Sequence, residues 1–167
     1  MAESPRILVQ AADFNPGAEL ARLAGAEAGG IASFTGIVRA GQGAGPRVSA
    51  LTLEHYPGMT EAALSKIAAR AQARWALTGC TIIHRIGRLL PGENIVFVAA
   101  ASAHRGAALR AVEFLIDYLK TSAPFWKAEE LETGERRWVA ARAADDAAAA
   151  AWNARGVGGA AARENKE

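Results

Sequence analysis

The chain has 167 residues and a mass of 17.4 kDa, which fits one compact domain and excludes two large ones. Apolar residues make up 51% of the sequence, but almost half of them are alanine, so a core must be built from few large side chains. The net charge of +2 is too small to keep the chain unfolded by self-repulsion or to form an extended nucleic-acid-binding surface.

The first part of the chain alternates β-rich runs with one helical segment. Asn15 followed by Pro16 is an N-cap with a proline in the first turn, which predicts a helix through about Ala28, before two glycines. β-branched and aromatic residues predict strands around this helix, at residues 6–10, 31–38 and 48–55, with a glycine-rich loop at residues 41–46.

The second part contains two helical patterns around a hairpin. Apolar residues at helical spacing predict an amphipathic helix over residues 60–75 and a second long helix over residues 104–119. Between them, the turn signature Leu90-Pro91-Gly92-Glu93 joins two β-rich runs, at residues 80–86 and 94–101. Pro124 breaks the second helix, and short β segments follow at residues 127–131 and 137–140.

These elements predict an α+β fold with a mixed or antiparallel sheet, two long helices and a small antiparallel β subdomain. We expect a single domain over residues 1–152. The remaining residues, 153–167, are rich in glycine, alanine and charge, and we expect them to form a disordered extension.

The residue inventory predicts neither a metal nor another cofactor. Cys80 is the only cysteine, and the three histidines are too widely spaced to suggest a metal site. Cys80 and His84 lie in an apolar strand, so core packing is the simpler role for both. No apolar run reaches membrane-span length and the N-terminus does not resemble a signal peptide, which predicts a cytoplasmic protein without membrane contact.

One candidate anion site lies where the predicted strand at 94–101 gives way to a helix. His104 and Arg105 add a titratable ring and a guanidinium group to the exposed amides of a helix N-terminus, which is a suitable place for a phosphate. The simpler alternative is an ordinary helix start with Ser102 as its N-cap.

A second candidate is the pair Lys120 and Lys127, on either side of the break at Pro124. A lysine at a helix C-terminus is explained equally well by the helix dipole. However, neighbouring cations and apolar side chains such as Phe125 and Trp126 lower a lysine pKa, which suits an acid, base or nucleophile. Residues 84–127 carry a net charge of +3, so the positive excess lies in this part of the chain.

The two candidates are far apart if one helix separates them. Sixteen residues from His104 to Lys120 span about 24 Å, too far for one small ligand. A symmetric dimer, in which the helix start of one protomer faces the helix end of the other, would bring them together. Arg39, at a strand end beside the glycine-rich loop, is a third candidate for ligand contact, with a solvated strand terminus as the alternative.

Seven motifs in the same order resemble the large, catalytic subunit of molybdopterin synthase over about residues 5–152. They are Phe34-Thr35-Gly36-Ile37-Val38-Arg39, Leu53-Glu54-His55-Tyr56-Pro57-Gly58-Met59, His84-Arg85-Ile86-Gly87, Ser102-Ala103-His104-Arg105, Asp117-Tyr118-Leu119-Lys120, Ala123-Pro124-Phe125-Trp126-Lys127 and Arg137-Trp138-Val139. The resemblance implies the α/β hammerhead fold of that family.

It also implies a reaction, the conversion of precursor Z, a cyclic pyranopterin monophosphate, into molybdopterin by insertion of two dithiolene sulfurs. In the family, the sulfur arrives on the thiocarboxylated C-terminus of a small ubiquitin-like subunit, and a homodimer of large subunits binds one small subunit at each end. The implied roles are catalysis for Lys120 and Lys127, with the division of steps between them open, and substrate binding for Arg39, His104, Arg105 and, less directly, Arg142.

Two other functions remain possible on the residues alone. One is a non-catalytic binding module for the tail of a ubiquitin-like protein. The other is a nucleic-acid-binding domain, suggested by Phe125 and Trp126 beside the two lysines, although the low net charge argues against it.

Overall fold

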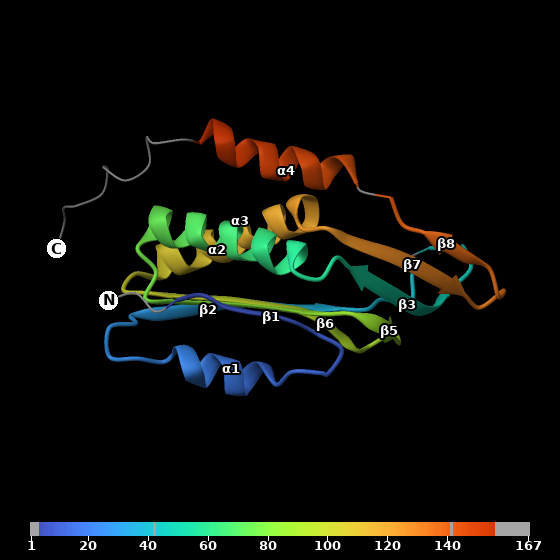
Figure 1. Cartoon of the computed structure of the whole chain (residues 1–167), viewed down its shortest axis with the longest axis horizontal. Coiled ribbons are helices and arrows are strands. Elements are labelled where there is room, and N and C mark those ends of the chain that lie inside the picture. The colour runs from blue at the N-terminus through green and yellow to red at the C-terminus, as the bar shows by residue number, and fades with distance from the viewer. Residues whose placement is uncertain (1–3, 42, 141, 156–167) are drawn as a thin grey trace.

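The computed structural model describes residues 4–41, 43–140 and 142–155, and their order of elements confirms the predicted α+β class (Figure 1). The elements are β1 (Arg6–Gln10), α1 (Pro16–Leu23), β2 (Gly30–Ile37), β3 (Val48–His55), α2 (Met59–Trp75), β4 (Gly79–Arg85), β5 (Gly87–Leu89), β6 (Asn94–Ser102), α3 (Arg105–Ser122), β7 (Phe125–Leu131), β8 (Arg136–Trp138) and α4 (Ala143–Ala154).

The strands form two sheets. The first has the order β1-β4-β6-β2, with β1 and β4 parallel and the other pairs antiparallel. The second has the order β5-β3-β7-β8 and is antiparallel throughout. Helices α2 and α3 cover one face of the first sheet and α1 covers the other, while the second sheet extends from one end (Figure 1). The predicted mixed sheet and small antiparallel subdomain are therefore both confirmed.

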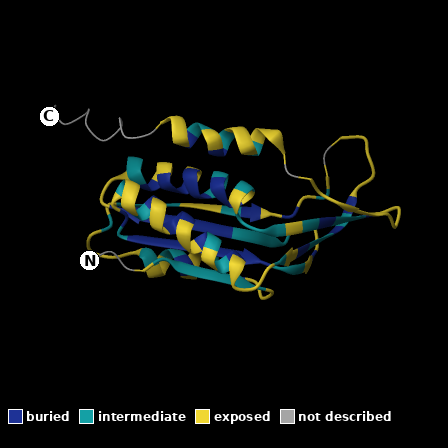
Figure 2. Ribbon diagram, turned by 45° about the horizontal axis from the view of Figure 1, so that its top comes forward, coloured by how far each residue is buried: buried dark blue, intermediate teal, exposed yellow. Residues whose placement is uncertain are grey.

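The main core lies between the first sheet and the pair α2 and α3. Large side chains such as Leu64, Ile82 and Phe114 are fully buried there. Figure 2 shows that buried segments gather on the strands of the sheet and on the helices beside it. Alanine also contributes to this core, since Ala68 of α2 and Ala111 of α3 are 0% exposed in the same cluster. The high alanine content thus allows the two helices to pack closely on the sheet.

Helix α4 was not predicted. It packs against α3, with Ala149 and Trp152 buried in the main core. The expected disordered extension was wrong for its first residues, since Asn153 and Ala154 belong to α4 and Asn153 accepts a hydrogen bond from the Tyr118 hydroxyl at 2.9 Å. The rest of that extension, residues 156–167, lies outside the described residues.

Several predicted boundaries also need correction. Helix α1 ends at Leu23, five residues before the expected end, because Ala24 already has an extended backbone. Helix α3 continues to Ser122, and Ala123 is extended, as expected for a residue before proline. The short strand β5 was missed because it pairs only with the distant β3. Within the part of the chain that the structure describes, no helix has the length and apolarity needed to cross a membrane.

Candidate functional site

The start of α3 forms a corner of the molecule that carries two of the predicted site residues. His104 is the N-cap of α3 and Arg105 its first residue, and both are exposed. They line a hollow of about 600 Å³ together with Gly29, Ala103 and Gly106. Ser102 is not the N-cap, because His104 holds that position and its side chain makes no capping bond, while the Ser102 Oγ accepts a hydrogen bond from the His104 N–H at 3.4 Å. The first amides of α3 therefore have no capping side chain, which favours an anion at this corner.

The corner depends on a close approach between two chain segments. The Gly29 N–H donates a hydrogen bond to the Ser102 carbonyl at 3.0 Å. A Cβ atom on Gly29 would lie 2.0 Å from the Ala103 carbonyl oxygen, a distance that no side chain tolerates. Glycine at position 29 thus allows the segment before β2 to pass directly beside Ala103, the residue before His104.

The end of α3 carries the other predicted residues. Helix α3 ends at Ser122, and the chain turns through Pro124 into β7, which brings Lys127 back toward Lys120. The pKa of Lys127 is lowered, first by burial and then by the positive charges of Lys120 and Arg142, while Asp145 acts in the opposite direction. We call Lys120, Lys127, Arg142 and Asp145 the lysine cluster.

Asp145 is the member that sequence reasoning missed. Its Oδ1 lies 3.6 Å from the Lys120 Nζ, and it stands in the first turn of α4, three residues after Arg142. The only local signal is an acidic pair, Asp145 and Asp146, which is typical of a helix N-terminus. Since α4 itself was not predicted, this signal could not be placed near a lysine.

A buried histidine borders the lysine cluster. The His84 ring stacks on Phe125 with the centroids 3.8 Å apart, and its Nδ1 donates to the Arg85 carbonyl at 2.8 Å. Burial lowers the pKa of His84 to about 4, and the charge of Lys127 acts in the same direction. The core role predicted for His84 is confirmed, and so is that of Cys80, whose thiol pKa is raised to about 12 by burial.

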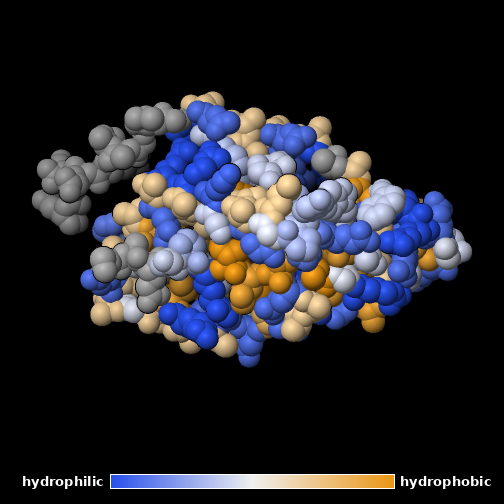
Figure 3. All heavy atoms as spheres, in the orientation of Figure 1, coloured by the Kyte–Doolittle hydropathy of each residue, from blue (hydrophilic) through white to orange (hydrophobic). Residues whose placement is uncertain are grey.

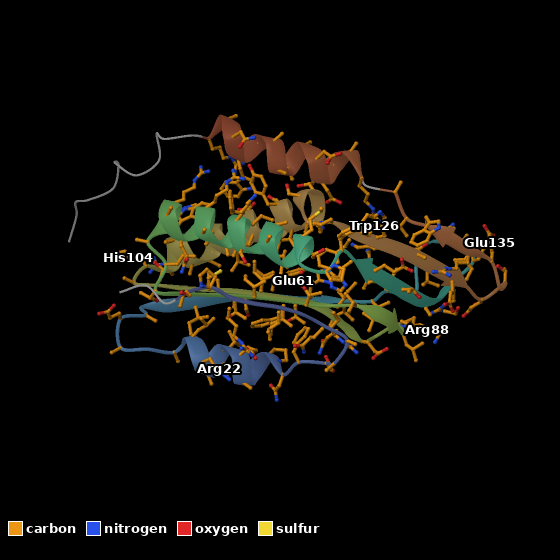
Figure 4. All side chains as sticks on the ribbon, in the orientation of Figure 1. Arg22, Glu61, Arg88, His104, Trp126 and Glu135 are labelled. Atoms are coloured by element: carbon orange, nitrogen blue, oxygen red, sulfur yellow. The ribbon has the colours of Figure 1, made fainter. Side chains whose placement is uncertain are left out.

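The corner and the lysine cluster lie at opposite ends of α3. Fifteen residues separate Arg105 from Lys120, a distance of about 22 Å along the helix. Figure 4 shows His104 at one end of the molecule and Trp126, the neighbour of Lys127 in the chain, past the middle toward the second sheet. One protomer therefore does not bring all the predicted residues together. This agrees with the separation that the sequence analysis expected from the length of the helix.

Arg39 lies on the side of the lysine cluster rather than of the corner. It follows the end of β2 at Ile37, which pairs with Asn94, whereas Gly30 at the other end of β2 pairs with Ser102 beside the corner. Arg39 is exposed. On the face seen in Figure 3, the end of the molecule formed by the second sheet is mainly hydrophilic.

No metal site accompanies these groups among residues 4–41, 43–140 and 142–155, where no three His, Cys, Asp or Glu side chains are close enough to hold an ion. The arrangement instead offers two groups of cations. One stands at a helix N-terminus and the other around a half-buried lysine, and both suit anionic ligands and proton transfer.

Comparison with known proteins identifies the family. The model of the MoaE protein family matches residues 9–122. The molybdopterin synthase catalytic subunit of Mesorhizobium japonicum is 52% identical over 152 residues, which cover 89% of this chain and 94% of that protein. The solved structure titled molybdopterin biosynthesis MoaE protein from Burkholderia ambifaria has a TM-score of 0.75 and 49% identity, and the match covers 89% of this chain and 98% of that one.

A more distant structure shares the fold. It is titled a protein–protein complex of subunits 1 and 2 of molybdopterin-converting factor from Helicobacter pylori, and it matches with a TM-score of 0.64 at 21% identity, over 84% of this chain and 92% of that chain. The resemblance seen in the seven sequence motifs is thus confirmed by the family model, a curated relative and a solved structure. The chain belongs to the MoaE family of molybdopterin synthase catalytic subunits.

Proposed function

We propose that the lysine cluster is the catalytic centre at which this sulfurtransferase converts precursor Z into molybdopterin, with Lys120 and Lys127 as the catalytic residues. The observation that carries the proposal is the environment of Lys127, which is half-buried and beside a second lysine, so its pKa is below the ordinary value. Such a lysine changes its protonation state more readily near neutral pH than an exposed one, as general acid–base catalysis requires.

The sulfur donor supports the same assignment. A thiocarboxylate at the C-terminus of the small ubiquitin-like subunit is an anion, and the cluster presents three cationic side chains, Lys120, Lys127 and Arg142. Cations placed around the reacting group stabilise the charge that develops while each carbon–sulfur bond forms. The Helicobacter pylori structure is titled as a complex of two subunits, which supports a partner of this kind for the present chain. We expect the reaction in the cytoplasm, and cell fractionation tests that expectation.

The corner at the other end of α3 suits the phosphate of precursor Z. His104 and Arg105 add their side chains to the uncapped amides of α3, and Arg39 supplies a further guanidinium group at the opposite end of β2. Because about 22 Å of helix separates the corner from the lysine cluster, His104 and Arg105 of one protomer would serve the lysines of a second, whose own Arg39 lies on the side of those lysines. A homodimer is then the smallest active form of the large subunit.

The test is reconstitution of the reaction from purified protein, thiocarboxylated small subunit and precursor Z. We expect Lys120→Ala and Lys127→Ala to lower the rate of molybdopterin formation about 100-fold or more while the small subunit still binds. Lys66→Ala is the matched control, because Lys66 is exposed on α2 and should be dispensable. Full activity of both cluster variants would overturn the proposal, and binding of the partner by the unchanged protein without any turnover would favour a binding module instead.

A further inference from the structure

Helix α4 brings a carboxylate to the two lysines. The Asp145 Oδ1 lies 3.6 Å from the Lys120 Nζ, and the Asp145 side chain is only 29% exposed. The Asp145 N–H donates a hydrogen bond to the Arg142 carbonyl at 3.0 Å, which forms the first turn of α4. This turn therefore fixes the position of the Asp145 backbone relative to that of Arg142. It places one negative and one positive residue at the start of α4.

The other end of α4 is fastened to α2 and α3. The Trp152 indole N–H donates to Asp117 at 2.7 Å, and the Tyr118 hydroxyl donates to Asn153 at 2.9 Å. The Arg74 guanidinium donates to the Trp152 carbonyl at 3.3 Å. Because a helix is stiff, these bonds near its C-terminus also fix the direction of its first turn. The position of Asp145 is thus determined by contacts that lie two turns away from it.

The charges around Lys127 explain why a carboxylate is needed there. Lys120 comes from α3, Arg142 precedes α4, and His84 of β4 lies close enough for its pKa to be affected by Lys127. The ammonium groups of Lys120 and Lys127 and the guanidinium group of Arg142 repel one another. The charges of Lys120 and Arg142 therefore favour the neutral form of Lys127. Asp145 is the negative charge that opposes them, since it raises the pKa of Lys127.

We propose that Asp145 is a positioning residue of the reaction, which holds the Lys120 ammonium group beside Lys127 and compensates the charge of the pair. The inference rests on the proposed function of the two lysines. The simpler role of Asp145, as an acid that complements the dipole of α4, is shared by its neighbour Asp146, which is exposed in the same turn. Asp146→Asn is therefore a matched control, since it removes the same charge from the same helix.

The experiment is an NMR titration of the lysine side chains in the full-length protein, without substrate. In Asp145→Asn we expect the pKa of Lys127 to fall by about 1 pH unit, because an opposite charge is lost, and we expect no change in Asp146→Asn. Asp145→Glu keeps the negative charge and should restore most of the original pKa of Lys127. An unchanged Lys127 titration in Asp145→Asn, or an equal change in Asp146→Asn, would overturn the inference.

Kinetics of the complex with the small subunit extend the test to the reaction. If Lys127 acts as a proton donor, the alkaline limb of the pH profile of kcat moves to lower pH by the same amount in Asp145→Asn and returns in Asp145→Glu. The two proposals fail in different ways. Full activity of both Lys120→Ala and Lys127→Ala overturns the proposed function, whereas inactive lysine variants together with an unchanged Lys127 titration in Asp145→Asn overturn the role of Asp145 alone.

Discussion

Trp152 donates its indole N–H to the carboxylate of Asp117 at 2.7 Å, which joins α4 to the helix that ends at the lysine cluster. The Trp152 ring also meets Trp75 and Phe114 edge to face, with centroids 5.6 Å away in both cases. With 3% of its surface exposed, this tryptophan is the main apolar anchor of α4.

We expect Trp152→Ala to lower the free energy of unfolding by about 3 to 5 kcal/mol, because it leaves a large cavity and removes the hydrogen bond to Asp117. Urea unfolding followed by circular dichroism measures the loss. Trp138→Ala is the control, since Trp138 is 60% exposed and its removal should change stability by less than about 0.5 kcal/mol. Equal losses in the two variants would contradict the anchoring role of Trp152.

A second prediction concerns acid. The pKa of His84 is lowered to about 4 in the folded protein by burial, whereas an unfolded histidine has a value near 6.5. Because the folded pKa is the lower one, the neutral ring contributes stability above pH 6.5, and this contribution is lost as the pH falls toward 4. The difference amounts to about 3 kcal/mol.

The measurement is the free energy of unfolding between pH 7 and pH 4, for the unchanged protein and for His84→Phe, which keeps a flat ring against Phe125. We expect a clearly smaller pH dependence in the variant, whatever its absolute stability. His104→Gln removes an exposed histidine and is the control for a general effect of losing an imidazole. If the curve of His84→Phe runs parallel to that of the unchanged protein, His84 does not stay neutral on folding.

The sequence predicts those parts of the fold that are determined by residues close together in the chain, and it does not predict those that depend on distant segments. The start of α3 at His104 and Arg105 and its end before Pro124 follow from residues that are neighbours in the chain, so the sequence could place the two groups of candidate residues at the two ends of one helix. The separation of corner and lysines also follows, because a helix has a fixed rise per residue. The parallel pairing of β1 with β4 joins segments more than 70 residues apart, and no local pattern predicts it.

Helix α4 shows the opposite case. Eight of its twelve residues are alanine, and Trp152 is its single large apolar side chain, so no amphipathic stripe marks it as a packed helix. Its place is determined by Asp117 and Tyr118 of α3, which cannot be known before the two helices are docked. Asp145 was missed for the same reason, since its significance depends on the position of α4.

A third prediction tests the close approach at the corner. Gly29→Ala would place a methyl group 2.0 Å from the Ala103 carbonyl, so the segment that carries His104 and Arg105 must move. We expect a loss of about 1 to 3 kcal/mol in unfolding free energy and a higher KM for precursor Z. Gly25→Ala is the control, because nothing lies within 4 Å of a Cβ atom there. Unchanged stability and KM in Gly29→Ala would show that the corner has no such constraint.

The last prediction tests whether the corner of one protomer serves the lysines of another. Arg105→Ala and Lys120→Ala should each be inactive alone. In a heterodimer of the two variants, one of the two sites combines an intact Arg105 from one protomer with an intact Lys120 from its partner. Random pairing makes half of the dimers heterodimers, so a co-refolded mixture should recover about a quarter of the unmodified activity.

A mixture of Arg105→Ala with His104→Ala is the control. Both substitutions lie at the same corner, so every site in the mixture contains one damaged corner and no activity should return. Differently tagged protomers and native mass spectrometry establish that heterodimers form in both mixtures. If heterodimers of Arg105→Ala and Lys120→Ala form but stay inactive, the two groups of residues do not share a site, and about 22 Å of helix α3 then separates two independent binding regions.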